Sequence, residues 1–147
     1  MRITKIKYDQ DTVSLEMDTP GTDDKMTLKS KLDPAETFTK ALAALKKYYI
    51  KFQEYEKLDP KKISAVGIKL FFAGAENKMS VAIIGVRELI NSTARQVQDS
   101  PTKAVEATQD AAEELVGDDC EKAIRKLILE AEKYAKGNRL QKDMFKE

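Results

Sequence analysis

The sequence predicts an α+β protein with a mainly antiparallel sheet, one helix that covers the sheet, and two further helices at the C-terminal end. Segments in which apolar and polar residues alternate lie on both sides of one long segment whose apolar residues have helical spacing. The expected order is therefore strand, strand, strand, helix, strand, strand. The chain has 147 residues, 41% of them apolar, which suffices for one ordinary core.

The N-terminal part of the chain has the pattern of three short antiparallel strands. Residues 3–8 and the segment after the turn at 9–11 form the first pair, and 25–30 form the third strand after a loop at 19–24. The alternation predicts a sheet with one buried face and one face in water. The alternating apolar residues of the second and third segments are Val13, Leu15, Met17, Met26 and Leu28.

A strong helix start follows at Asp33-Pro34-Ala35-Glu36. It combines an N-cap residue, a proline at the first helical position and a glutamate that can complete a capping box. Large apolar residues then recur at helical spacing, so this helix is expected to cover the sheet until Leu58-Asp59-Pro60 ends it. These residues are Phe38, Leu42, Leu45, Tyr49 and Phe52.

A second hairpin is expected from the alternation at 66–72 and 79–83 around a turn at 74–77. It would complete the sheet.

The polar segment 92–100 is interpreted as a connector or an irregular edge strand. Two helices are expected within 101–137, one from Ser100-Pro101 to Val116 and one after Gly117. The predicted division is a sheet domain at 1–91, a connector at 92–100, a helical pair at 101–137 and a tail at 138–147. The helix after Gly117 has an apolar stripe that offers a surface for self-association.

Composition excludes several classes of function. The chain contains no histidine, which removes the commonest general acid/base and the commonest nitrogen ligand of zinc. It has no glycine-rich phosphate loop, and its paired aspartates are explained by turns and helix caps. We therefore expect no enzymatic activity, no catalytic residue, no cofactor and no metal.

Charge and cysteine content indicate the compartment. The formal net charge is only +1, so nucleic-acid binding would require a local basic patch. No apolar run is long enough for a membrane span or a signal peptide, and the single Cys120 suits a reducing compartment. The expected location is the cytoplasm, with no membrane contact.

One face of the predicted sheet carries lysines and an aromatic residue. Phe71 and Phe72 are neighbours in a strand, so they point to opposite faces and only one can enter the core. An exposed Phe71, together with Lys7, Lys29 and Lys69, would form a stacking platform for single-stranded nucleic acid. Lysines on a strand face are also commonly just solvated, and they protect sheet edges.

The C-terminal tail carries two large apolar residues without periodic partners, Met144 and Phe145. Together with Gln141 and Asp143 they resemble the peptide by which bacterial polymerases, repair proteins and clamp loaders bind the DNA sliding clamp. The resemblance implies that glutamine hydrogen-bonds at the rim of an apolar pocket that Met144 and Phe145 fill, while Asp143 orients the peptide. The alternative is that both apolar residues fold back onto the last helix.

The N-terminal region also resembles small uncharacterised proteins of bacteriophages and prophages whose genes lie near recombination and single-strand-binding genes. The resemblance rests on Met1-Arg2-Ile3-Thr4-Lys5-Ile6-Lys7-Tyr8, Thr27-Leu28-Lys29-Ser30, Pro34, Phe38, Ala41-Leu42, Leu45 and Val66-Gly67-Ile68. It implies an accessory role in DNA replication or recombination in a bacterial host cell.

Three functional hypotheses follow. The first is a phage accessory protein that binds the host sliding clamp through its tail. The second is a protein that binds single-stranded nucleic acid on the sheet face. The third is an inhibitor of a host or defence protein.

Overall fold

The computed structural model describes residues 2–74, 76–89, 94–106 and 115–137. Its elements are β1 (Arg2–Asp9), β2 (Thr12–Asp18), β3 (Lys25–Ser30), α1 (Glu36–Ala43), α2 (Lys46–Gln53), the 3₁₀-helix η1 (Pro60–Lys62), β4 (Ile63–Ala73), β5 (Lys78–Glu88), β6 (Arg95–Asp99), β7 (Lys103–Ala104) and α3 (Asp118–Ala135). Within these residues, no helix combines the length and apolar character required to cross a membrane.

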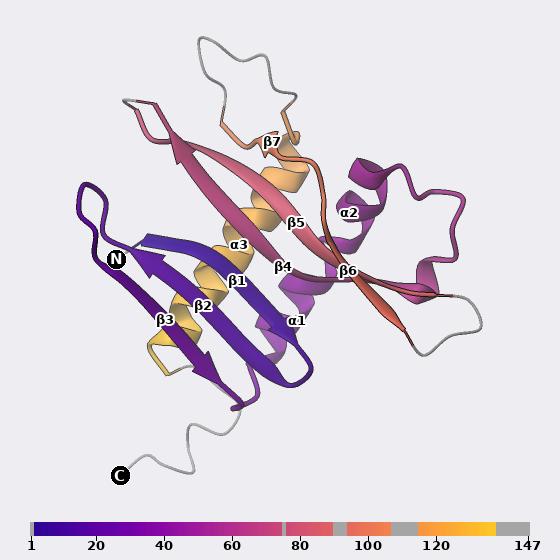
Figure 1. Ribbon diagram of the computed structural model, residues 1–147, viewed down its shortest axis with the longest axis horizontal. Coiled ribbons are helices and arrows are strands. Elements are labelled where there is room, and N and C mark those ends of the chain that lie inside the picture. The colour runs from indigo at the N-terminus through magenta and orange to yellow at the C-terminus, as the bar shows by residue number, and fades with distance from the viewer. Residues whose placement is uncertain (1, 75, 90–93, 107–114, 138–147) are drawn as a thin grey trace.

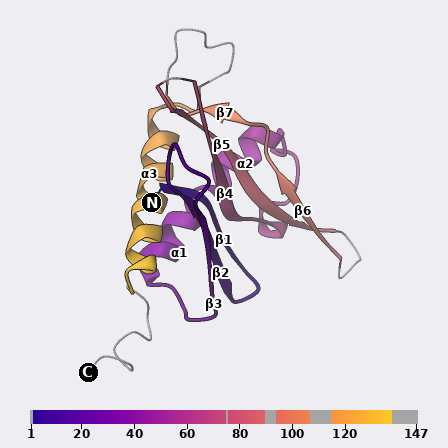
Figure 2. The ribbon, with the colours of Figure 1, turned by 60° about the vertical axis from the view of Figure 1, so that its left-hand side comes forward.

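The strands form one antiparallel sheet in the order β3-β2-β1-β4-β5-β6, and the short β7 pairs with β5. The helices lie on one side of it, behind the sheet in Figure 1, and α1 and α3 stand beside it in the turned view of Figure 2. The predicted α+β fold with a mainly antiparallel sheet is therefore confirmed. No helix of the described residues lies over its other face.

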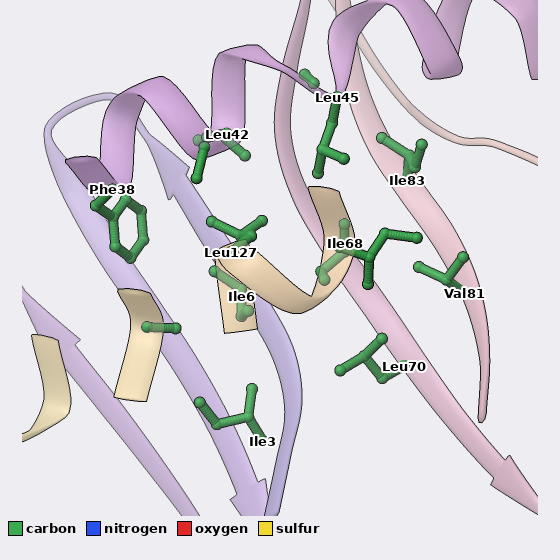
Figure 3. Close-up of a cluster of buried hydrophobic side chains, with 14 of the residues drawn as sticks. Ile3, Ile6, Phe38, Leu42, Leu45, Ile68, Leu70, Val81, Ile83 and Leu127 are labelled. Atoms are coloured by element: carbon green, nitrogen blue, oxygen red, sulfur yellow. The ribbon is translucent and has the colours of Figure 1, made fainter. Parts of the chain in front are cut away.

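The core lies between the sheet and the helices. Phe38 and Leu42 of α1 and Leu127 of α3 point toward Ile6 and Ile68 on the two central strands (Figure 3). The side chains of Val13, Leu15 and Met17 are buried on β2, as the alternation predicts. Along β2, alternation thus places apolar side chains under the helices and polar ones on the other face.

The helical segment after Asp33 differs from the expected single helix because it is divided into α1 and α2. Leu45 and Tyr48 donate their backbone N–H groups to the carbonyls three residues before them, at 3.1 Å each, so the chain tightens at this point. Leu45 and Tyr49 are fully buried after the break. The break lets α1 pack on α3 and β4 while α2 packs on β4 and β5.

Residues 101–106 differ from the helix expected to begin at Ser100-Pro101, because this segment follows the edge of β5. Ser100 donates its N–H to Ile83 O and accepts the N–H of Ile83 on its hydroxyl, both at 2.8 Å. Val105 donates its N–H to Met79 O at 2.9 Å and is buried. Pairing with β5 satisfies these backbone groups and overrides the local helical tendency. The rest of the expected helix includes residues outside the described part.

The expected helix after Gly117 is present as α3, and its stripe of apolar residues faces the sheet core. Ile124, Leu127, Ala131 and Tyr134 are fully buried, and the Tyr134 hydroxyl donates to Leu32 O at 2.7 Å. The stripe is consequently covered by this chain's own sheet.

Candidate functional site

The uncovered face of β1, β2 and β3 carries a row of polar side chains. Lys7 pairs with Ser14 in the sheet register, and Ser14 pairs with Lys29, so the two lysines stand on either side of a hydroxyl. This face is hollowed into an open depression of about 540 Å³. Its lining residues are Lys5, Lys7, Asp9, Gln10, Thr12, Ser14, Glu16, Thr27 and Lys29.

Ion pairs neutralise both acidic residues of this depression. Lys5 Nζ lies 3.4 Å from Glu16 Oε2, and Arg95 Nη2 lies 2.6 Å from Asp9 Oδ1. Among the described residues, no salt bridge engages Lys7 or Lys29. The depression therefore has two lysines available to an anion, and its carboxylates are already occupied.

β4 continues the same face with Lys69 and Phe71. Lys69 pairs with Lys5 in the register, and Phe71 is 46% exposed. Phe72 instead lies on the core side, where the Arg2 guanidinium is 4.0 Å from the centre of its ring. Phe71 is thus the aromatic residue that faces solvent, as strand alternation requires.

Lys69 is less available than the sequence suggests. Its Nζ lies 2.7 Å from Asp99 Oδ2 on β6, two strands away. Lys5 beside it is bound to Glu16, so this second row of lysines is largely neutralised. Of the four residues expected on the nucleic-acid face, Lys7, Lys29 and Phe71 are available and Lys69 is engaged.

The ion pair between Asp9 and Arg95 also shows that the sheet curls toward this face. Asp9 on β1 and Arg95 on β6 are three strand spacings apart, about 14 Å in a flat sheet, yet their side chains meet. The hydrogen bond to Asp9 raises the pKa of Arg95 above its usual value. Beneath the curl, Val66, Ile84 and Val86 form a small buried cluster on β4 and β5. The open depression lies at the other end of this face, on β1, β2 and β3.

The available residues form a diagonal across the open end. Lys29 and Phe71 are three strands apart laterally and four residues apart along the strand, since Lys7 pairs with Gly67 of β4. With ordinary sheet spacings the diagonal measures about 20 Å. This length suits a few nucleotides of a single strand, with phosphates at Lys29 and Lys7 and a base on Phe71.

The expected clamp-binding residues Gln141, Asp143, Met144 and Phe145 lie outside the described residues. The described chain ends just after α3, where Gly137 has a φ of 105°. A glycine with this backbone angle commonly stops a helix. The sequence from 138 onward follows that stop.

The described residues contain no group of three or more side chains able to hold a metal ion. Cys120 is buried, and desolvation raises the pKa of its thiol to about 11, with a smaller opposing effect from Lys51. A neutral buried thiol is a poor nucleophile.

Sequence patterns give no sign of the ion pairs that Arg95, Asp9 and Asp99 form. Their charges are visible in the sequence, but their pairing depends on the arrangement of the strands in the sheet. No family model, curated protein or solved structure matches the chain.

Proposed function

We propose that this is a non-enzymatic accessory protein of phage DNA replication or recombination, tethered to the host sliding clamp through residues 141–145. The peptide match carries this proposal: all four specified positions fit, at Gln141, Asp143, Met144 and Phe145. The motif begins four residues after Gly137, the helix-stopping glycine that follows α3. An extended peptide beyond a helix can enter an apolar pocket through a few anchor side chains.

Binding to a purified bacterial sliding clamp tests this proposal. The full chain should bind, and Met144→Ala together with Phe145→Ala should weaken binding at least about 30-fold, the effect of losing a typical anchor residue. Lys142→Ala is the matched control because its position is unspecified in the motif. A chain ending at Leu140 that binds as well as the full chain, or a full chain that does not bind, removes the proposal.

A second candidate function is binding of single-stranded nucleic acid on the open sheet face. The supporting observation is that Lys7 and Lys29, which have no salt bridge to a described residue, lie on the same face as the exposed Phe71. Lysines supply the salt-dependent attraction to phosphates, and an exposed ring stacks on any base.

Fluorescence anisotropy with a labelled oligothymidine tests this candidate. Phe71→Ala should weaken binding at least about fivefold, since stacking contributes roughly 1–3 kcal/mol per base. Lys7→Ala and Lys29→Ala should each reduce the dependence of affinity on salt. Leu129→Ala and Lys126→Ala on α3 are matched controls, because both residues are exposed on the helical side. Equal losses in the α3 controls would refute a site on the sheet face.

A further inference from the structure

β3 is an edge strand of unusual regularity. It pairs with β2 at six consecutive positions without a register shift, from Val13↔Ser30 to Asp18↔Lys25. In the part of the chain that the structure describes, no strand pairs with its other side. It contains no proline and no bulge, two of the features that prevent an edge from pairing. Its lysines oppose pairing with another lysine-bearing edge but not with an acidic strand.

The opposite edge strand, β6, forms more side-chain hydrogen bonds and ion pairs with the rest of the described chain than β3 does. The Tyr55 hydroxyl donates to Gln98 Oε1 at 2.6 Å, and Gln53 Nε2 donates to Asp99 O at 3.2 Å. Two of its side chains, those of Arg95 and Asp99, are also held in ion pairs. Of the two edges, β3 is therefore the better candidate for an added strand.

The two sides of β3 differ in chemistry. On the open face it presents Lys25, Thr27 and Lys29, and on the core side it presents Met26 and Leu28. Met26 is 46% exposed, so the helical layer leaves the apolar side of this edge partly uncovered. Leu28 packs against the core beside it.

A strand added at this edge would place alternate side chains beside these two sets. Side chains on the open face would lie next to the lysines, where carboxylates are favoured. Side chains on the other face would lie next to Met26 and Leu28, where apolar groups are favoured. We propose that the free edge of β3 accepts an extended segment of a partner protein in which acidic and apolar residues alternate.

In the two registers that pair most of β3 with itself, a second copy of this chain does not meet that requirement. Antiparallel pairing of two β3 strands about Thr27 places Lys25 opposite Lys29 of the other copy. Pairing about Leu28 places Lys25 opposite Lys31, just beyond the strand. Like charges directly opposite each other destabilise a sheet, so charge complementarity selects an acidic segment of a different protein.

Anisotropy with labelled nine-residue peptides of alternating glutamate and valine tests this proposal, which does not depend on the clamp or nucleic-acid proposals. The alternating peptide should bind at least tenfold more tightly than a peptide of the same composition in which the glutamates and valines are grouped. Lys25→Glu with Lys29→Glu should abolish binding, while Lys126→Glu should leave it unchanged. A far-UV spectrum shows whether the exposed substitutions preserve the fold.

Backbone methylation of the peptide separates strand addition from simple charge attraction. In a β-ladder, alternate N–H groups point toward the neighbouring strand and away from it. Methylation of the peptide N–H groups that point toward β3 should therefore abolish binding, and methylation of the N–H groups that point away should leave binding unchanged. Equal binding of both methylated peptides or of the grouped peptide would overturn the proposal, as would self-association of the chain that Lys25→Glu with Lys29→Glu abolishes.

Discussion

Gly85 on β5 lies directly beneath the aromatic ring of Tyr49 on α2. A Cβ atom added at Gly85 would overlap three carbon atoms of that ring. Tyr49 is fully buried, so its ring cannot swing into solvent to make room. Gly85 does not have a left-handed φ, and alanine is therefore compatible with its backbone. Gly85→Ala thus perturbs only the packing of α2 on the sheet.

The size of the effect follows from this geometry. Overpacking of a close-packed core costs about 1–3 kcal/mol. Tyr49→Ala alone should cost about 3–5 kcal/mol because it removes a buried ring. In the Tyr49→Ala background the overlap is gone, and alanine in a strand is favoured over glycine by roughly 0.5–1 kcal/mol. The two substitutions should therefore couple by about 1.5–4 kcal/mol.

Urea denaturation of the four proteins of this double-mutant cycle measures the coupling. Gly85→Ala alone should lower the free energy of unfolding, and the same change should raise it slightly when Tyr49 is already alanine. Gly67→Ala is a suitable control, because its Cβ would meet the backbone carbonyl of Ile6 on β1 and would not be relieved by Tyr49→Ala. An equal cost of Gly85→Ala in both backgrounds would refute the reasoning.

Three further predictions concern single contacts. Cys120 should not react with thiol reagents at pH 8 in the native protein, because its pKa is about 11, and should react quickly in urea. The hydrogen bond from Arg2 lowers the pKa of Asp18 below 3.8. The stabilisation that this ion pair gives the folded protein is therefore present above pH 3.8 and is lost as the pH falls through the lowered pKa. Arg2→Ala should raise the pKa of Asp18 in an NMR titration. Thr37→Val should cost about 1–3 kcal/mol in urea denaturation, because it removes the hydroxyl that donates to the buried Glu130 carboxylate at 2.6 Å.

The candidate sheet face was predictable in part. Alternation assigns Phe71 to one side of β4 and Phe72 to the other, and it places Lys7 and Lys29 among polar positions. It does not reveal which lysines are bound to carboxylates. Lys69 meets Asp99 because β4 and β6 are both neighbours of β5, and the two residues are 30 positions apart in the chain.

The sequence by itself determined the class of elements, since the period of the apolar residues distinguishes the strands from the helix starting near Asp33 and from α3. It also determined which side of β2 is buried, but not that Val66 of β4, beside a register shift, belongs to a separate buried cluster with Ile84 and Val86. Only the tertiary structure decided that β1 lies beside β4, that α1 and α2 are separate, and that Val105 lies along β5. The physical reason is that a side-chain pattern specifies the face of an element, whereas the partner of that element depends on hydrogen bonds and packing between distant segments.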